Sequence, residues 1–287
     1  MQSLYDVAAP AKLNLFLHIT GRRADGYHLL QSVFMLIDWC DTLHFELRSD
    51  GRITREDLNT GQPTSALPAA DLTVRAARAL QQACGTPLGV HIGLEKRIPA
   101  QAGMGGGSSD AASCLLALQR LWGVRLPAAQ LQALALSLGA DVPFFLSGGH
   151  AWVEGIGEKI TPISLPAARF VVVKTASCLS THDIFTALSL KRDSHTARIQ
   201  GFATNDALED FRFGKNDLQP VAQQLCPVLT QSLDWLATHQ LSGRMTGSGS
   251  AVFARLPEGV NVDFQVAPSG WTVHQCRNLS QHPLADW

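Results

Sequence analysis

Apolar and polar side chains alternate near the start of the chain, and this pattern predicts a β-strand over residues 7–19. One face of that strand carries Leu13, Leu15, Leu17 and Ile19. The opposite face carries Lys12, Asn14, Phe16 and His18. Because successive side chains of a strand point to opposite faces, Lys12 and Asn14 project from the same face. The polar segment GRRADGYH at residues 21–28 follows and predicts a loop or hairpin connection.

The same kind of pattern predicts elements along the rest of the chain. Further strands are expected at residues 33–37, 42–47, 90–96 and 169–174. Helical periodicity predicts helices at residues 71–84, 109–121, 127–138, 181–189, 217–225 and 228–240. Turn-rich sequence predicts surface loops over residues 48–68, a turn at GADVPFF (139–145) and a hairpin around residues 155–157.

The order of these elements favours an α+β fold. Strands come in runs and helices come in runs, without regular β-α-β alternation. The 287 residues are enough for two modest domains or one large one. We place a boundary near residues 164–168 and expect domains over residues 1–162 and 163–287.

Composition excludes several classes of function. The formal net charge of −1 gives no global attraction for nucleic acid or a membrane surface. The first apolar run is broken by Lys12 and Asn14, and no run reaches the length of a bilayer span. We therefore expect a cytoplasmic protein. The six cysteines are scattered without a CxxC pair, which favours reduced, buried thiols over zinc binding or a disulfide framework.

The strongest chemical signal is IPAQAGMGGGSSDAA at residues 98–112, a glycine-rich loop that runs into a predicted helix. Glycine tolerates positive φ angles and allows close approach to the backbone. Free N–H groups and the helix dipole attract anions at a helix start, and phosphate is the natural ligand. We expect Ser108 and Ser109 to cap this helix and to offer hydroxyls to a phosphate or to magnesium. A flexible linker is the alternative, but Pro99 and the strong helix after the loop favour the phosphate site.

The loop differs from two common phosphate motifs. It lacks the GK[ST] ending of a Walker A loop, and GMGGGSS lacks the spacing of GxGxxG. By itself the loop predicts phosphate binding and does not name a reaction.

Three separated segments resemble the GHMP family of small-molecule kinases. PAQAGMGGGSSDAA resembles the family's central motif, APAKLNLFLHI its first motif and MTGSGSAVFA its third, in the same order along nearly the whole chain. Residues 11–28 and 139–149 further resemble a bacterial and plastid member that uses ATP to phosphorylate a cytidyl diphosphate substrate on a route to isoprenoids. The resemblance implies an N-terminal ribosomal-protein-S5-like ATP-binding domain and a C-terminal ferredoxin-like substrate domain, with the active site in the cleft between them.

The resemblance assigns catalysis to Asp141 and Lys12. Phosphoryl transfer requires positioning and charge neutralisation, and Asp141 would orient or deprotonate the attacking hydroxyl. The alternative for Asp141 is an ordinary N-cap of a short helix over residues 142–146. Lys12 would keep the carboxylate ionised and offset negative charge, whereas the alternative is a solvated strand lysine.

The resemblance also assigns residues to the two substrates. ATP binding falls to the glycine loop and the lysine before it, namely Lys96, Pro99, Gly103, Met104, Gly105, Gly106, Gly107, Ser108 and Ser109. Substrate binding falls to Asn14, Tyr27, His28, Thr181, Phe185, Gly247, Ser248 and Gly249. Tyr27 and Phe185 are expected to stack on a cytosine ring, while His28 reads its polar edge. The alternatives are a strand-end lysine at residue 96, a turn at residue 27, a helix cap at residue 181, a core aromatic at residue 185 and a tight turn at residues 247–249.

ATP and Mg²⁺ are the cofactors that the resemblance implies. Magnesium would be held mostly by phosphates, water and one hydroxyl, because no carboxylate cluster indicates a dedicated metal site. The partner is a small cytidyl diphosphate molecule, and we expect a monomer or weak homodimer that binds neither nucleic acid nor a membrane.

Two other functions stay open at this point. One is a family kinase for another small alcohol, of the homoserine or mevalonate type, but ADGYH at residues 24–28 suits a nucleobase-bearing substrate better. The other is a silent nucleotide-binding regulator, which the presence of Lys12 and Asp141 disfavours. Asp71 stands where the resembled sequences carry asparagine, and its role is not assigned.

Overall fold

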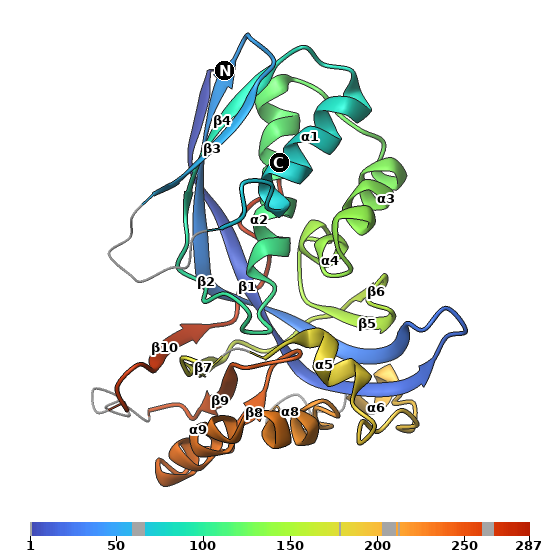
Figure 1. Ribbon diagram of the computed structural model, residues 1–287, viewed down its shortest axis with the longest axis vertical. Coiled ribbons are helices and arrows are strands. Elements are labelled where there is room, and N and C mark those ends of the chain that lie inside the picture. The colour runs from blue at the N-terminus through green and yellow to red at the C-terminus, as the bar shows by residue number, and fades with distance from the viewer. Residues whose placement is uncertain (1, 59–66, 178, 203–210, 212, 260–266) are drawn as a thin grey trace.

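The computed structural model describes residues 2–58, 67–177, 179–202, 211, 213–259 and 267–287, and its described strands form two sheets (Figure 1). The first sheet has the order β3-β4-β2-β5-β6, with β1 paired to β2, and the second has the order β10-β7-β9-β8. The strands of the first sheet are β1 (Ser3–Arg22), β2 (His28–Arg48), β3 (Ile53–Leu58), β4 (Gly89–Glu95), β5 (Ala151–Gly155) and β6 (Lys159–Pro162). Those of the second are β7 (Arg169–Lys174), β8 (Arg244–Met245), β9 (Val252–Leu256) and β10 (Thr272–Arg277).

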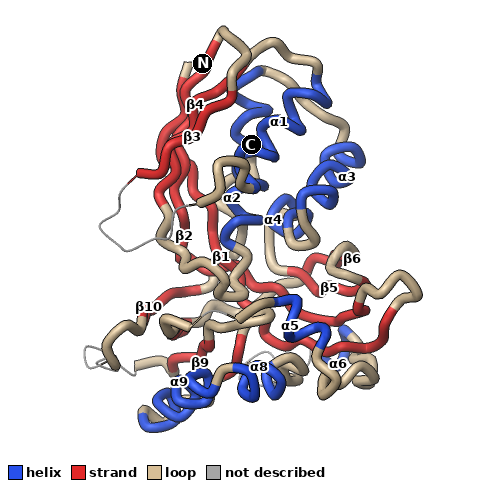
Figure 2. Tube along the Cα trace, viewed as in Figure 1, coloured by secondary structure: helices blue, strands red, loops and turns tan. Residues whose placement is uncertain are grey.

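Helices lie on both sheets (Figure 2). The first sheet is covered on one face by α1 (Leu72–Cys84), α2 (Gly106–Trp122), α3 (Ala128–Leu138) and α4 (Val142–Leu146). The second half of the chain contributes α5 (Thr181–Thr186), α6 (Ile199–Phe202), α8 (Gln219–Leu225) and α9 (Pro227–Thr238). Of these, α8 and α9 pack against the second sheet, while α5 and α6 lie beside the far end of the β1-β2 hairpin.

The long antiparallel β1-β2 hairpin links the two sheets. Its β1 strand pairs with β2 along almost its whole length and contacts α2. Further along β1, the Leu17 N–H donates to the carbonyl of Lys215 at 2.9 Å, and the Ile19 N–H donates to the Asp217 carboxylate at 2.9 Å. One hairpin therefore carries residues of the first sheet into contact with the second half of the chain.

Three buried apolar clusters stabilise this arrangement. One lies between the first sheet and α1 to α4, and another lies between the second sheet and α8 and α9. The third joins the two halves and contains Phe16 from β1, Trp152 from β5 and Phe170 from β7, each less than 4% exposed. Burial of large side chains contributes about 1.5–3 kcal/mol each, so this shared cluster fixes the two sheets relative to one another.

Most elements predicted from periodicity are confirmed. The strand over 169–174 is found with those bounds, and α1, β4, α3, α8 and α9 fall within one to three residues of the predicted ranges. The connection at GRRADGYH is a tight loop, in which the Arg23 N–H donates to the Tyr27 carbonyl at 2.7 Å. Strong local patterns with clear end signals were sufficient for these elements.

Four boundaries were predicted wrongly. The strands expected at 33–37 and 42–47 are one continuous strand, β2. Part of the segment predicted as surface loops, 48–68, forms β3, a largely polar edge strand that pairs in parallel with β4; residues 59–66 lie outside the described residues. The predicted turn at 139–145 contains the short helix α4, and the helix predicted over 181–189 ends at Thr186. Short or edge elements depend on neighbours far away in sequence, which local periodicity does not report.

Candidate active site

The glycine loop places the start of α2 at one side of the site. Gly105 is the N-cap residue, with φ 70° in the left-handed region, and the Ser109 N–H donates to the Gly105 carbonyl at 2.9 Å. Ser108 and Ser109 therefore lie inside the first turn, and the prediction that they cap the helix was wrong. Among the described residues, the backbone N–H groups of Gly106, Gly107 and Ser108 have no acceptor. Three free amides at the positive end of a 17-residue helix form a site for an anion.

A second glycine loop, at residues 246–250, packs directly against the first. A Cβ atom at Gly103 would lie 2.2 Å from the Thr246 carbonyl oxygen, and one at Gly247 would lie 2.6 Å from the Gly103 carbonyl oxygen. The Ala251 N–H donates to the Ala102 carbonyl at 3.3 Å. Only glycine permits this backbone contact, so the close approach expected of the second loop is made to the first loop.

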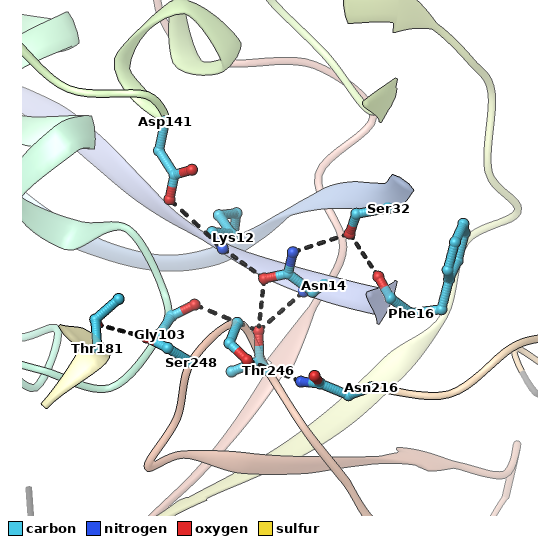
Figure 3. A network of polar contacts seen from close by, with 11 residues as sticks. Lys12, Asn14, Phe16, Ser32, Gly103, Asp141, Thr181, Asn216, Thr246 and Ser248 are labelled. Carbon is cyan, nitrogen blue, oxygen red and sulfur yellow. Dashed lines mark hydrogen bonds and ion pairs between the residues drawn. The ribbon is translucent and has the colours of Figure 1, made fainter. Parts of the chain in front are cut away.

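Lys12 and Asp141 lie together beside the glycine loop (Figure 3). Lys12 Nζ is 3.6 Å from Asp141 Oδ2, and the Lys12 N–H donates to the Met104 carbonyl at 3.0 Å. A Cβ atom at Gly105 would lie 3.4 Å from Lys12 Cε. The lysine and the aspartate predicted to act in catalysis thus share one location with the loop predicted to bind phosphate.

Burial sets the electrostatics of this pair. The side chain of Lys12 is 4% exposed and that of Asp141 is 33% exposed. Burial lowers the pKa of Lys12, and the nearby Asp141 carboxylate offsets part of that effect. Within the described part of the chain, the Asp141 side chain caps no amide of α4, although Asp141 is the residue before that helix. Its carboxylate is directed toward Lys12, so the capping alternative does not account for it (Figure 3).

Asn14 fixes the position of the Lys12 ammonium through a hydrogen bond. Its Oδ1 accepts from Lys12 Nζ at 2.5 Å, and its Nδ2 donates to the Ser32 hydroxyl at 2.9 Å. Its backbone N–H donates to the Thr246 hydroxyl at 2.9 Å, which connects β1 to the second glycine loop (Figure 3). Asn14 is 1% exposed, so in this structure it orients Lys12, and a direct contact with substrate stays a prediction.

The residues predicted for the cytidyl substrate lie at two places. Thr181 Oγ1 is 2.8 Å from Ser248 Oγ, which joins α5 to the second glycine loop. The cap of α5 is Ser180, whose hydroxyl accepts from the Asp183 N–H, so the capping role considered for Thr181 is wrong.

The second place is the end of the hairpin. The His28 ring packs against the Phe185 ring with centroids 5.1 Å apart, and the neighbouring Tyr27 is 61% exposed. The alternative of a half-buried tyrosine fits Tyr27 poorly, because its side chain is mostly exposed. Phe185 is partly buried and packs against the apolar cluster of the second sheet, so the alternative of a core phenylalanine stays open beside the stacking prediction.

Three residues of the predicted ATP set, Lys96, Met104 and Pro99, are partly or fully buried, and Lys96 is paired within the protein. The Lys96 ammonium pairs with Asp110 Oδ2 at 2.7 Å and with the Asp41 carboxylate. Burial alone would lower the pKa of Lys96, but the two carboxylates outweigh it and the pKa is raised. Met104 is 1% exposed and faces the core, and Pro99 is half-buried. Direct ATP contacts of these side chains stay predictions.

Sequence reasoning missed several residues that build the site. Asn216 is 3% exposed and its Nδ2 donates to the carbonyls of Met245 and Gly247, each at 2.8 Å. Asp41 Oδ1 accepts from the N–H groups of Arg97 and Ile98, which fixes the start of the glycine loop. Thr246 lies inside the recognised MTGSGS segment, but it was not singled out there. Nothing in the sequence marks Asn216 or Asp41, because the backbone groups that they hold in the two glycine loops are 29 or more residues away.

Comparison with known proteins identifies the class. The sequence profile described as "GHMP kinases N terminal domain" matches residues 71–149, and "GHMP kinases C terminal" matches residues 204–263. The chain belongs to the GHMP kinase family. It is an ATP-dependent phosphotransferase by that membership.

The proteins to which this chain is similar carry names that are narrower than the family. A protein of Polaromonas sp. named "4-diphosphocytidyl-2-C-methyl-D-erythritol kinase" is 73% identical over all of this chain and 95% of its own length. A protein of the same name from Polaromonas naphthalenivorans is 71% identical over all of this chain and 97% of its own length. A crystal structure of "4-(cytidine 5'-diphospho)-2C-methyl-D-erythritol kinase" superposes with a TM-score of 0.74 at 38% identity, covering 88% of this chain and 90% of that one.

Two further findings concern metals and membranes. Within the described ranges, no group of three His, Cys, Asp or Glu side chains is placed to hold a metal ion. None of the helices in the described residues is long and apolar enough to cross a membrane.

Proposed function

We propose that this chain transfers the terminal phosphoryl group of ATP to the C2 hydroxyl of 4-diphosphocytidyl-2-C-methyl-D-erythritol, a step of the non-mevalonate route to isoprenoid precursors. Full-length relatives of that name support the substrate. The observation that carries the chemistry is the Lys12–Asp141 pair beside the glycine loop, with its lysine bonded to Met104 of that loop.

The loop amides bind the phosphates of the nucleotide in this proposal. The free N–H groups of Gly106, Gly107 and Ser108 point outward from the start of α2 and carry its partial positive charge. They offset negative charge that builds up on the transferring group, and they are already positioned before the reaction.

Asp141 and Lys12 act on the acceptor alcohol. The carboxylate of Asp141 accepts the hydrogen bond of the attacking hydroxyl and directs its oxygen at the terminal phosphorus. As the new O–P bond forms, the hydroxyl proton passes to the Asp141 carboxylate, the bond between the terminal phosphorus and the bridging oxygen breaks, and the negative charge of that oxygen leaves on ADP. The buried ammonium of Lys12, held by Asn14, stabilises the charge near the acceptor oxygen.

Magnesium fits the donors present. Ser109 Oγ is buried and has no hydrogen-bond partner among the described residues, so a hydroxyl ligand is available at the phosphate end of α2. When bound with ATP, magnesium would supply further charge neutralisation. Oxygens of the ATP phosphates would provide its other ligands.

The Tyr27, His28 and Phe185 group takes the cytosine ring in this proposal. Its rings offer stacking surfaces, and the imidazole adds a polar group at their edge. A substrate without a nucleobase leaves this group unused, which distinguishes the proposal from a kinase for homoserine or mevalonate.

The test is a direct substrate comparison. ADP release is measured with the cytidyl substrate, homoserine and mevalonate in parallel, and the product is located by ³¹P NMR. We expect turnover with the cytidyl substrate alone and one new phosphomonoester signal at the C2 oxygen. Turnover with homoserine or mevalonate in the absence of any with the cytidyl substrate refutes the assignment, and ATP binding without turnover on any of the three supports the silent regulator.

A further inference from the structure

Arg192, in the loop after α5, holds the ring of His28 in one orientation. Its Nε–H donates to His28 Nε2 at 3.0 Å. Its other N–H groups donate to backbone carbonyls of Leu190 at 3.0 Å, of Phe185 at 3.2 Å and of Ala187 at 2.8 Å. The guanidinium is thus fixed by four contacts, three of them with backbone, and one of those belongs to the phenylalanine that packs on the His28 ring.

This geometry determines which nitrogen of His28 carries the proton. A guanidinium has donors and no acceptor, so Nε2 of His28 has to be the acceptor. A neutral imidazole that accepts at Nε2 carries its hydrogen on Nδ1. Burial, together with the charges of Arg192 and Arg22, lowers the pKa of His28 and favours this neutral form. In the described part of the chain, Nδ1 has no partner, so its N–H is available to a ligand.

We propose that Arg192 is a positioning residue for substrate recognition: it fixes the Nδ1–H tautomer of His28, whose N–H then donates to an acceptor atom on the cytosine edge of the substrate. Cytosine offers acceptors at N3 and O2, and the free Nδ1–H lies on a ring that already packs on Phe185, beside the exposed Tyr27. The inference deepens the proposed function and rests on it for the identity of the base.

The tautomer is measurable in the protein without substrate. We expect ¹⁵N-histidine NMR of the full chain to show His28 with a protonated Nδ1 and an unprotonated Nε2 at pH 7.5. In R192M the Nε2–H form should become populated and the pKa of His28 should rise. A protonated Nε2 in the unsubstituted protein overturns the proposal, whatever the substrate is.

A double-mutant cycle separates proton control from simple support of Phe185. In H28N, the side-chain amide offers an N–H near the position of Nδ1 without any need for Arg192. We expect R192M to raise KM for the cytidyl substrate about tenfold in the unsubstituted background, the effect of one lost hydrogen bond, with kcat changed less than about twofold. In the H28N background the same substitution should change KM less than about twofold. An equal factor in both backgrounds shows that Arg192 acts only by anchoring α5, and this outcome overturns the proposal.

Two controls keep this result distinct from failure of the proposed function. R78M removes an exposed arginine of α1 and should leave KM and the His28 signals unchanged. H28Q, whose amide reaches the Nε2 position instead, should raise KM where H28N does not. If the enzyme is inactive on the cytidyl substrate while His28 still shows the Nδ1–H form, the proposed function fails and the tautomer assignment stands. If the enzyme turns over the cytidyl substrate and R192M leaves KM unchanged, the role of Arg192 in recognition is rejected and the proposed function stands.

Discussion

The glycine loop lies beside Lys12, which is buried, and follows Lys96, which is partly buried, and the surroundings of the two lysines differ. Lys96 lies between the carboxylates of Asp41 and Asp110, which are 0% and 2% exposed. Among the described residues, Lys12 is paired with one carboxylate, that of the partly exposed Asp141, at 3.6 Å. Burial lowers the pKa of Lys12, whereas the two carboxylates around Lys96 overcome the same penalty and raise its pKa. The charge of Lys96 is compensated inside the protein, and that of Lys12 is compensated only in part.

The difference indicates a division of work. Asp41 also accepts from the N–H groups of Arg97 and Ile98, so the Lys96 cluster fixes both ends of the glycine loop, at β4 and in α2. Such a cluster sets geometry and leaves little charge for a ligand. Lys12 keeps an ammonium whose field is directed at the place where Asp141 would hold the acceptor alcohol. We therefore predict that the reaction depends on the incompletely compensated lysine, and that the glycine loop depends on the compensated one.

The largest effect is expected from D141N, which removes the charge that Lys12 faces. The variant keeps the shape of the side chain but accepts a weaker hydrogen bond from the substrate hydroxyl. We expect kcat to fall about 10³- to 10⁴-fold, in the range of a lost general base or orienting group, with the Kd for ATP changed by less than about threefold. Steady-state turnover and calorimetric ATP binding measure the two quantities. The matched control is D50N, an exposed aspartate paired with Arg48, which should retain full turnover; unchanged turnover in D141N removes Asp141 from the mechanism.

The second prediction concerns the structural lysine. K96M leaves Asp41 and Asp110 buried without their cation, and removing one member of a buried ion pair costs about 3–5 kcal/mol. The free energy of unfolding, measured with urea at pH 7.5, should drop by that amount. In K96M/D41N/D110N, which removes all three charges, most of the loss should be recovered. If K96M is as stable as the unsubstituted protein, the cluster does not support the loop.

Sequence patterns predicted the glycine loop, and the family resemblance added both catalytic candidates, but neither predicted this contrast between the two lysines. The central motif and the alternation around Lys12 are local features, so residues 98–112 and the polar face of β1 were recognisable. The partners of Lys96 come from β2 and α2, and Thr246 lies 232 residues from Asn14, so only the folded chain brings them together. The capping role of Ser108 and Ser109 was wrong because Gly105 adopts the left-handed conformation and starts the helix earlier. Contacts between distant segments have no signature in a single sequence.

The third prediction is the counterpart of K96M. Lys12 is 3% exposed, and its ammonium lies 4.5 Å from the centre of the Phe34 ring. K12M keeps most of the apolar stem and removes that ammonium. We expect kcat to fall about 10²-fold, the usual loss for one electrostatic contact in the transition state, while ATP affinity changes little. Because a desolvated charge disappears and Asp141 is partly exposed, the free energy of unfolding should stay level or rise. A K12M variant that loses stability as K96M does, with normal kcat, contradicts the division of work.

The smallest effect extends the comparison to two buried histidines, His150 and His282, which have no charged partner among the described residues. His150 and His282 are 3% and 1% exposed, and burial lowers the pKa of each from 6.5 to about 4. The Nδ1 atoms accept from the N–H groups of Leu36 and Leu284, while within the described residues each Nε2 is buried without a partner. The His282 N–H also donates to the Gly148 carbonyl at 2.8 Å, which docks the C-terminal segment next to α4.

The direction in which the free energy of unfolding changes with pH follows from proton uptake by the unfolded chain. Below pH 6.5 the unfolded chain binds a proton at each histidine that the folded chain excludes, so stability falls as the pH drops from 6.5 toward 4 and levels off below the folded pKa. Each histidine should cost about 2 kcal/mol between pH 7 and pH 5. Urea unfolding at the two pH values measures the loss, and H282N should reduce it by about that amount, whereas H195Q, at an exposed position, should leave it unchanged. A loss that persists in H150N/H282N shows that other groups govern the acid sensitivity, and that uncompensated burial matters here only for Lys12.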